Sequence, residues 1–185
     1  MPLTVLIVGA AVVLSLLRGG RFGRIAEADL RLTWLLFVGL ALQLGVDAAA
    51  ARGHLEGNDG YVLLLLSQLL VVGWTLANWW RPGMLLIFLG LALNAAVMAA
   101  NGAMPVAPEA IEAIGLEGAE VPPGKHELMT EDTRLAVLAD TWPLPPIRTI
   151  ISIGDIVLAA GLIPLVHHLM TYRTPAERRG GPRVR

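Results

Sequence analysis

The sequence predicts an all-α integral membrane protein, a bundle of five transmembrane helices. Hydrophobic residues make up 55% of the chain and charged residues 16%, whereas an average soluble domain has about 25% charged residues. The apolar residues form continuous blocks instead of alternating with polar ones, which favours helices over strands. Each block is close to the roughly 20 residues that a helix needs to cross a hydrocarbon core of about 30 Å.

The predicted spans are 2–17, 32–51, 61–80, 84–100 and 149–170. The first is the shortest, about 24 Å as a helix, so we expect Arg18 to extend its side chain to the membrane surface. Residues 18–31 mix apolar and basic side chains, which is typical of a short interfacial helix. Residues 81–83 form a tight hairpin. Residues 1–172 are thus predicted to be a single membrane domain, followed by a disordered, basic cytoplasmic tail at 173–185.

The distribution of positive charge predicts the orientation of the chain. Most of the 14 Lys and Arg residues lie in 18–31, at Arg81 and in the tail. Because loops rich in Lys and Arg stay in the cytoplasm, the N-terminus is expected outside and the C-terminus in the cytoplasm. Aromatic residues favour membrane interfaces, and those at the predicted cytoplasmic ends agree with this orientation: Trp34, Trp79, Trp80 and Tyr172.

The connection 101–148 is too long to be a simple link and is predicted to be a partly helical extracytoplasmic loop. Pro108 suits a first helical position, so a short helix is expected over 108–114. Thr130 can cap a second helix that runs to about Ala139. The proline-rich stretch 142–146 is expected to be stiff and extended. We expect this loop to pack onto the bundle.

Polar side chains inside the apolar blocks gather in the half that is predicted to face outside. With Met104 and polar residues of the loop they give the candidate ligand-binding set: Gln43, Asp47, Gln68, Asn94, Asn101, Met104, Asp132, Arg134, Asp140, Ser152 and Asp155. One interpretation is an outward-facing polar pocket under the loop. The other is structural: Ser152 and Asp155 match a capping box, Asp47 reaches surface water, and the amides join helices.

Several kinds of chemistry are disfavoured by the sequence. The chain has no cysteine, which excludes disulfides, thiolate metal sites and iron–sulfur clusters. His167 and His168 point about 100° apart on one helix and no other span has a histidine, so we interpret them as interfacial rather than as haem ligands. No cofactor or metal is expected. No basic surface away from the membrane edge indicates nucleic acid. The expected partners are the lipid bilayer and either a small molecule or another membrane protein.

Short motifs in the loop and at the ends of the last two spans carry a resemblance that covers nearly the whole chain. They lie at 101–106, 132–135, 138–140 and 152–155, and a further one at 16–21. On these residues the chain resembles a bacterial multi-pass membrane protein family known only as a domain of unknown function (five-three-one-seven). Ala103 stands where a second glycine is expected in that family. The resemblance implies a five-span protein of the bacterial plasma membrane and implies no reaction.

Three hypotheses for the function follow. The first is a protein that binds, or helps to transport, a small polar or amphiphilic ligand in the outward-facing pocket. The second is a structural or assembly subunit of a larger membrane complex, because the chain is small and has no catalytic motif. The third, a membrane-embedded enzyme that uses Asp132, Asp140 or Asp155 as an acid or base, ranks last because no recognised catalytic spacing is present.

Overall fold

The computed structural model describes residues 2–50, 52, 54, 59–116 and 126–172. Its long helices lie close to the predicted apolar blocks, and they are α1 (Pro2–Leu17), α3 (Thr33–Ala50), α4 (Asp59–Ala77), α5 (Met84–Asn101) and α7 (Ile153–Thr171). A single-turn helix, α2 (Gly23–Ala26), lies in the connection where an interfacial helix was expected. The positions of the long helices thus follow directly from apolar composition.

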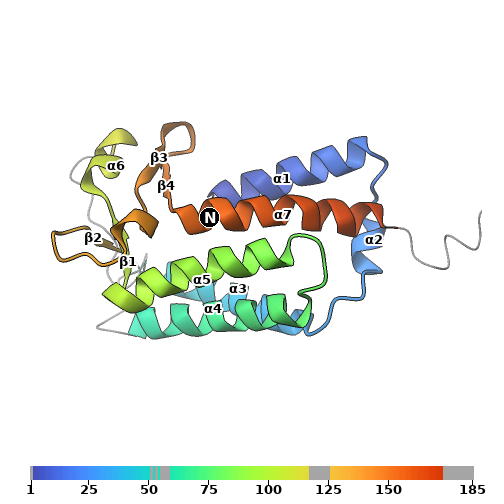
Figure 1. The fold of residues 1–185 in the computed structure, drawn as a ribbon, viewed down its shortest axis with the longest axis horizontal. Coiled ribbons are helices and arrows are strands. Elements are labelled where there is room, and N and C mark those ends of the chain that lie inside the picture. Colours follow the sequence, from blue (N-terminus) through green and yellow to red (C-terminus); the bar gives the residue numbers. More distant parts are fainter. Residues whose placement is uncertain (1, 51, 53, 55–58, 117–125, 173–185) are drawn as a thin grey trace, which may run out of the picture.

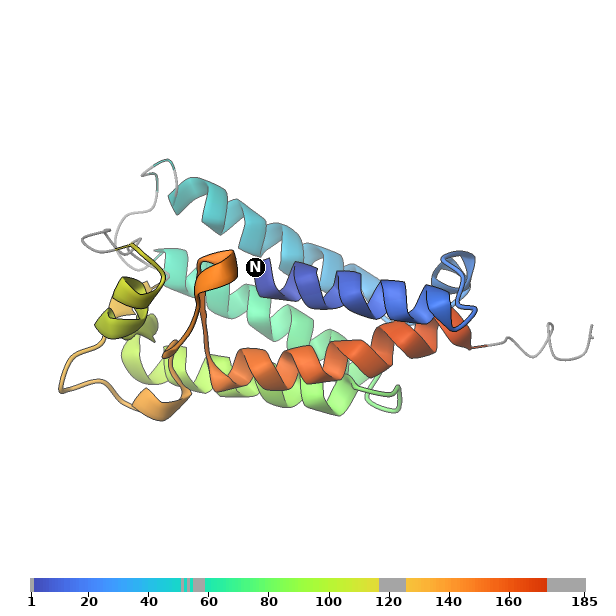
Figure 2. The same cartoon turned by 90° about the horizontal axis from the view of Figure 1, so that it is seen from above.

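The long helices pack side by side in an order that differs from their order along the chain (Figures 1 and 2). The main contacts join α1 to α7, α7 to α5, α5 to α4 and α4 to α3. The C-terminal helix α7 therefore lies between the first helix and α5, and α1 and α3 occupy the two ends of this series.

Glycines allow the backbones of α5 and α7 to approach closely. A Cβ atom on Gly90 would lie 2.5 Å from the carbonyl oxygen of Gly154, and one on Gly161 would lie 2.6 Å from the carbonyl oxygen of Gly83. Such distances are far below the roughly 3.5–4.0 Å of an ordinary contact between nonbonded heavy atoms. Small residues at these positions are thus required for the observed packing of the two helices.

Two apolar clusters fill the space between the helices. One is next to the long loop and comprises Val46, Leu64, Val97, Met98, Met104 and Ala139. The other is near the opposite end and comprises Val71, Trp74, Met84, Ile87, Leu91 and Leu165. The first cluster includes residues of the loop itself, so the loop packs onto the helices, as the sequence predicts.

Three helices, α4, α5 and α7, are long and apolar enough to cross a membrane. The apolar stretches of α1 and α3, Leu3–Leu17 and Thr33–Ala49, are shorter. Large apolar side chains also face outward from the helices, including Phe37 at 65%, Leu44 at 62% and Leu85 at 64% exposure. Soluble proteins rarely expose large contiguous apolar patches, so this surface suits a lipid environment.

The described residues of 102–152, which we call the cap, cover one end of the bundle, next to the end of α5 and the start of α7 (Figure 1). Its elements are β1 (Met104–Val106), α6 (Pro108–Ala113), β2 (His126–Leu128), β3 (Trp142–Leu144), β4 (Thr149–Ile151) and the 3₁₀ turns Ala136–Leu138 and Pro145–Ile147. Strand β1 pairs in parallel with β2, with Met104 opposite His126. Strand β3 pairs antiparallel with β4, with Trp142 opposite Ile151.

The cap corrects three predictions. The fold is mostly helical but not all-α, because the cap contains two small sheets. The last long helix begins at Ile153, since residues 149–151 form β4 instead of the start of a span. The helix expected from Thr130 to Ala139 is absent apart from a 3₁₀ turn. Thr130 donates its N–H to Thr133 Oγ1, and Leu135 adopts φ +55°, so the backbone turns away from a helical path.

Candidate functional site

One group of predicted pocket residues links α5 to the start of α7. Asn94 Nδ2 donates to Asp155 Oδ1 over 2.9 Å, and Ser152 Oγ donates to Asn94 Oδ1 over 3.0 Å. Ser152 Oγ also accepts the Asp155 N–H over 3.0 Å, while the Ser152 N–H donates to Asp155 Oδ2 over 3.3 Å. The capping box expected from the sequence is therefore present. Because these groups satisfy one another, they hold the helices together and start α7.

A second group attaches the cap to the end of α5. Asn101 Nδ2 donates to the carbonyl oxygens of Val97 and Arg134, each over 2.9 Å. Asn101 Oδ1 accepts the Arg134 N–H over 2.8 Å. The amide side chain thus pairs with the Arg134 backbone in the way that a neighbouring strand would. The structure brings these two predicted residues together through the Arg134 backbone and not through its guanidinium.

The other predicted residues of the helical part are separate from these groups. Gln43 and Asp47 are half-buried on α3. Gln68 Nε2 lies 3.4 Å from Met98 Sδ, and its Oε1 is buried with no hydrogen-bond partner among the described residues. In the cap, Met104 of β1 is a buried member of the apolar cluster that joins the cap to the helices. These side chains therefore do not extend the hydrogen bonds of the α5–α7 junction.

The two loop carboxylates also differ in their surroundings. Asp132 is exposed in a turn. Asp140 has a side chain that is only 10% exposed, and its Oδ2 lies 3.8 Å from His126 Nε2. The Asp140 N–H donates to the carbonyl oxygen of Pro105 over 3.0 Å, and its own carbonyl oxygen accepts the Ala107 N–H over 3.0 Å. Asp140 thus helps to join strand segments of the cap.

A polar cavity is lined by residues of α2, the linker to α3, the α4–α5 hairpin and the C-terminal end of α7. Figure 1 shows α2 beside the C-terminal end of α7, at the end of the molecule away from the cap. We call this cavity the Arg81 cavity. It has a volume of about 250 Å³ and is lined by Arg24, Glu27, Ala28, Asp29, Arg81, His168, Leu169 and Tyr172. Two guanidinium groups, two carboxylates and an imidazole therefore surround one small space.

Arg81 has a donor in this region that no described residue accepts. Its Nη2 donates to the backbone carbonyl of Asp29 over 2.7 Å, and its Nη1 lies 3.5 Å from His168 Nε2. Its Nε is buried and has no hydrogen-bond partner among the described residues. A guanidinium has five N–H donors and no acceptor, so an oxygen-bearing ligand in the cavity is a suitable partner for the remaining donors.

Local contacts fix the walls of the cavity. The Arg21 N–H donates to the carbonyl oxygen of Met170 over 2.9 Å, and Arg24 Nη1 donates to the same oxygen over 3.4 Å. Asn78 holds the linker between α2 and α3, because its Oδ1 accepts the Arg31 N–H and its Nδ2 donates to the Arg31 carbonyl, each over 2.9 Å. The cavity is thus a part of the folded structure with defined walls.

The adjacent histidines point toward different parts of the structure, as expected from their spacing on one helix. His167 Nδ1 lies 3.3 Å from Ser15 Oγ on α1, so its ring contacts the neighbouring helix. His168 lines the Arg81 cavity and its ring centroid lies 5.0 Å from that of Tyr172. Only the second histidine is therefore placed to contact a ligand in the cavity.

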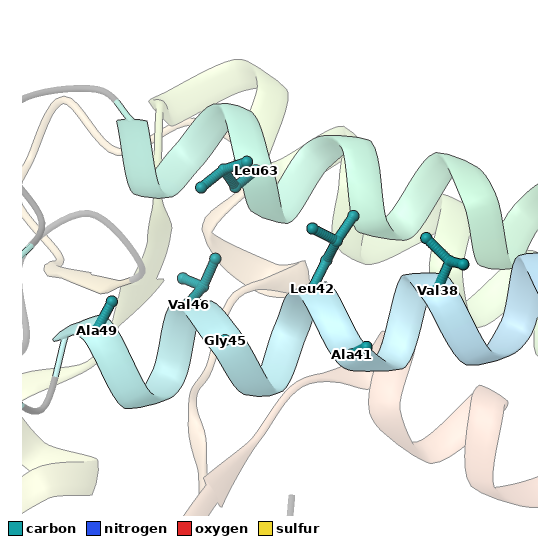
Figure 3. A pocket seen from close by; sticks show the side chains of 7 residues that line it. All are labelled: Val38, Ala41, Leu42, Gly45, Val46, Ala49 and Leu63. Carbon is teal, nitrogen blue, oxygen red and sulfur yellow. The ribbon is translucent and has the colours of Figure 1, made fainter.

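A second, apolar groove of about 340 Å³ runs along α3 beside Leu63 of α4 (Figure 3). Six residues of α3 line it: Val38, Ala41, Leu42, Gly45, Val46 and Ala49. The groove follows the small-residue stripe of that helix, which allows close approach of another apolar chain. It has no polar side chain that could fix the orientation of a polar ligand.

The sequence contains a signal for the Arg81 cavity, namely basic residues and two histidines at one end of the bundle. From the sequence alone, these residues predict the orientation of the chain and a membrane interface. Glu27 and Asp29 gave no recognisable motif. Their meeting with Arg81 depends on how the short connections fold back, which no spacing along the chain predicts.

Comparison with known proteins identifies a family. Residues 27–167 match the model of a family of unknown function, DUF5317, so the chain belongs to that family. No curated protein matches the chain, and no solved structure does. The matched region includes the α5–α7 junction, the cap and Arg81, while Arg24 lies just outside it.

Proposed function

We propose that this member of the DUF5317 family is a multi-pass membrane protein that binds a small polar or amphiphilic ligand in the Arg81 cavity. The sequence placed such a ligand under the cap. The contacts of the described residues favour the opposite end instead, because the Asn94 and Asn101 groups are already engaged in hydrogen bonds within the protein. A site needs polar groups that a ligand can still reach, and the Arg81 cavity provides them.

The observation that carries this proposal is the environment of the Arg81 guanidinium. In the described part of the chain no carboxylate forms an ion pair with it, and its buried Nε has no partner. A buried donor without a partner costs about 1–3 kcal/mol. A ligand oxygen that accepts from Arg81 would remove this cost, so the cavity favours binding of an acceptor-rich group.

The proposed setting is a bacterial plasma membrane crossed five times. The short helices α1 and α3 pack against α7 and α4, which supports their placement in the same layer as the three longer helices. The basic residues near α2 and Arg81 favour a cytoplasmic position for that end, with the cap outside. The cavity would then open at the cytoplasmic surface of the membrane.

Ligand binding can be tested by thermal stabilisation of the detergent-purified protein with a panel of phosphate- and carboxylate-bearing compounds. We expect at least one class to stabilise the wild type and the effect to be lost in Arg81→Gln. Arg21→Gln is the matched control, since Arg21 is an exposed arginine near the same end that does not line the cavity. Equal responses of the two variants to every compound would refute binding at this site.

The proposed orientation can be tested because the chain has no cysteine of its own. Single cysteines at Val137 in the cap and at Trp79 near the cavity would report two exposed positions, which have 76% and 71% exposure. In sealed vesicles of known orientation, a membrane-impermeant thiol reagent should label only one of them from a given side. Labelling of both positions from the same side would contradict the proposed crossing.

A second candidate function is assembly with another membrane protein. The observation that favours it is the apolar groove on α3, a helix at the end of the series, with Gly45 and two alanines along its length. A transmembrane helix of a partner could pack there. Purification in mild detergent should then recover a stoichiometric partner, and Gly45→Leu should release it. If the wild type and Gly45→Leu are both purified as monomers without a partner, this function is wrong.

The enzyme hypothesis receives less support. Asp155 caps α7 and bonds to Asn94, Asp140 pairs with His126 in the cap, and Asp132 is exposed in a turn. An acid–base pair must reach one substrate from two sides, and these carboxylates belong to different local structures. We therefore do not assign them a catalytic role.

A further inference from the structure

The Arg81 cavity contains charges of both signs. Arg24 and Arg81 contribute two positive charges, and Glu27 and Asp29 contribute two negative ones. In the described part of the chain neither carboxylate forms an ion pair with a side chain within 4.0 Å. A simple anion in the cavity would be attracted by the two guanidinium groups but repelled by the two carboxylates. A ligand that carries both charges fits the lining better.

We infer that the Arg81 cavity binds a zwitterion in which a phosphate ester and a primary ammonium group are joined by a short chain, as in the headgroup of phosphatidylethanolamine. This inference rests on the proposed binding function and names its ligand class. The phosphate would accept hydrogen bonds from Arg81, Arg24 and His168. The ammonium group would lie against Glu27 and Asp29.

The number and kind of donors favour a phosphate over a carboxylate. A carboxylate is matched by the two-pronged edge of one guanidinium, whereas a phosphate ester presents several acceptor oxygens in different directions. Here two guanidinium groups and an imidazole come from three elements, namely α2, the α4–α5 hairpin and α7. Donors that approach from three directions suit a tetrahedral group.

The size and position of the cavity favour a lipid headgroup as the source. About 250 Å³ is smaller than the roughly 300–1,000 Å³ of pockets for drug-sized ligands. The cavity is at the end of α7 and next to the α4–α5 hairpin, where the exposed rings of Trp79 and Trp80 mark a membrane interface. Nearby, Leu17 is 81% exposed and Phe22 is 59% exposed, which provides apolar surface for acyl chains.

Native mass spectrometry of the full chain, released from detergent with defined lipids, tests this inference. The lipids are phosphatidylethanolamine, phosphatidylglycerol and phosphatidylcholine with identical acyl chains. Free phosphoethanolamine is tested in parallel as the soluble headgroup without acyl chains. We expect phosphatidylethanolamine to be retained about tenfold better than phosphatidylglycerol. Arg81→Gln should reduce its retention by about tenfold, the effect of losing one hydrogen bond to a charged group. Arg21→Gln changes only an exposed side chain and keeps the backbone bond to Met170, so it should leave retention unchanged.

The carboxylates provide the discriminating variant. The double change Glu27→Gln and Asp29→Asn should remove the preference for phosphatidylethanolamine and raise retention of phosphatidylglycerol, because the repulsion of the anion is gone. If the wild type retains phosphatidylglycerol best, and this retention depends on Arg81, the inference of a zwitterionic ligand is wrong but the proposed ligand binding stands. Binding of free phosphoethanolamine as tightly as the lipid would overturn the lipid source. Retention that does not depend on Arg81 for any compound would overturn the proposed function itself.

Discussion

The close approach of α5 and α7 yields a quantitative prediction for Gly90→Ala. The added methyl group would lie 2.5 Å from the Gly154 carbonyl oxygen and 2.6 Å from the Leu158 backbone nitrogen. Both neighbours are backbone atoms of α7, so a side-chain rotation cannot relieve the clash. The two helices must move apart or the variant must accept strain.

Gly45→Ala is the matched control. Gly45 is also inside a long helix, but a Cβ there meets no atom within 4 Å. Both variants gain the same intrinsic helix preference of alanine over glycine, about 1 kcal/mol. The difference between them therefore isolates the packing effect. Overpacking costs about 1–3 kcal/mol, so we expect Gly90→Ala to unfold with a free energy about 1–3 kcal/mol below that of Gly45→Ala.

The comparison can be made by denaturant titration of each variant in the same mixed micelles, with helix content followed by circular dichroism. A larger difference than about 3 kcal/mol would indicate that the junction with Asn94 is lost as well. If Gly90→Ala proves as stable as Gly45→Ala, the close packing of α5 against α7 is wrong, and the order of helices in the bundle must be revised.

Three further changes test the contacts of the cap and the cavity. Asn101→Ala removes the side-chain bonds to the Arg134 backbone, so amide hydrogen exchange should accelerate around that residue while α4 is unaffected; unchanged exchange would refute its anchoring role. Ser152→Ala should destabilise the chain by about 0.5–2 kcal/mol in the same titration, whereas Ser152→Thr should retain most of the stability. Asn78→Ala releases the backbone of Arg31, so proteolysis after Arg31 should be faster and thermal stabilisation of the protein by ligands should be weaker. Unchanged cleavage would contradict the role of Asn78 in holding this linker.

The helical part of the fold was predictable because it depends on composition within short windows. The apolar block at 2–17 coincides with α1, and the block at 84–100 differs from α5 by a single residue. Strand β4 was not predictable in the same way, since 149–151 continues the apolar run into α7 and only its pairing with β3 makes it a strand. Propensity describes a segment, whereas pairing depends on a partner elsewhere in the chain.

The predicted second loop helix failed for a related reason. Its sequence has a suitable cap at Thr130 and apolar residues at helical spacing, but the backbone of Arg134 is bound by Asn101 from α5. This long-range contact supplies hydrogen bonds that a helix would otherwise have to supply locally. From the sequence, Asn101 is a candidate either for ligand binding or for joining helices, and its observed partner is the loop backbone at Arg134.

The location of the candidate site follows from where polar groups can remain unsatisfied. Inside a bundle of apolar helices, a lone polar group has no water to bond and is costly, and Asn94 avoids this cost by pairing with Ser152 and Asp155. At the end of the bundle the charged groups of several elements come together, and Arg81 there has a donor that no described residue accepts. Polar residues within the apolar segments of such a protein therefore mark contacts between its helices. Its ligand-binding site is better sought among the charged residues at the ends of the helices.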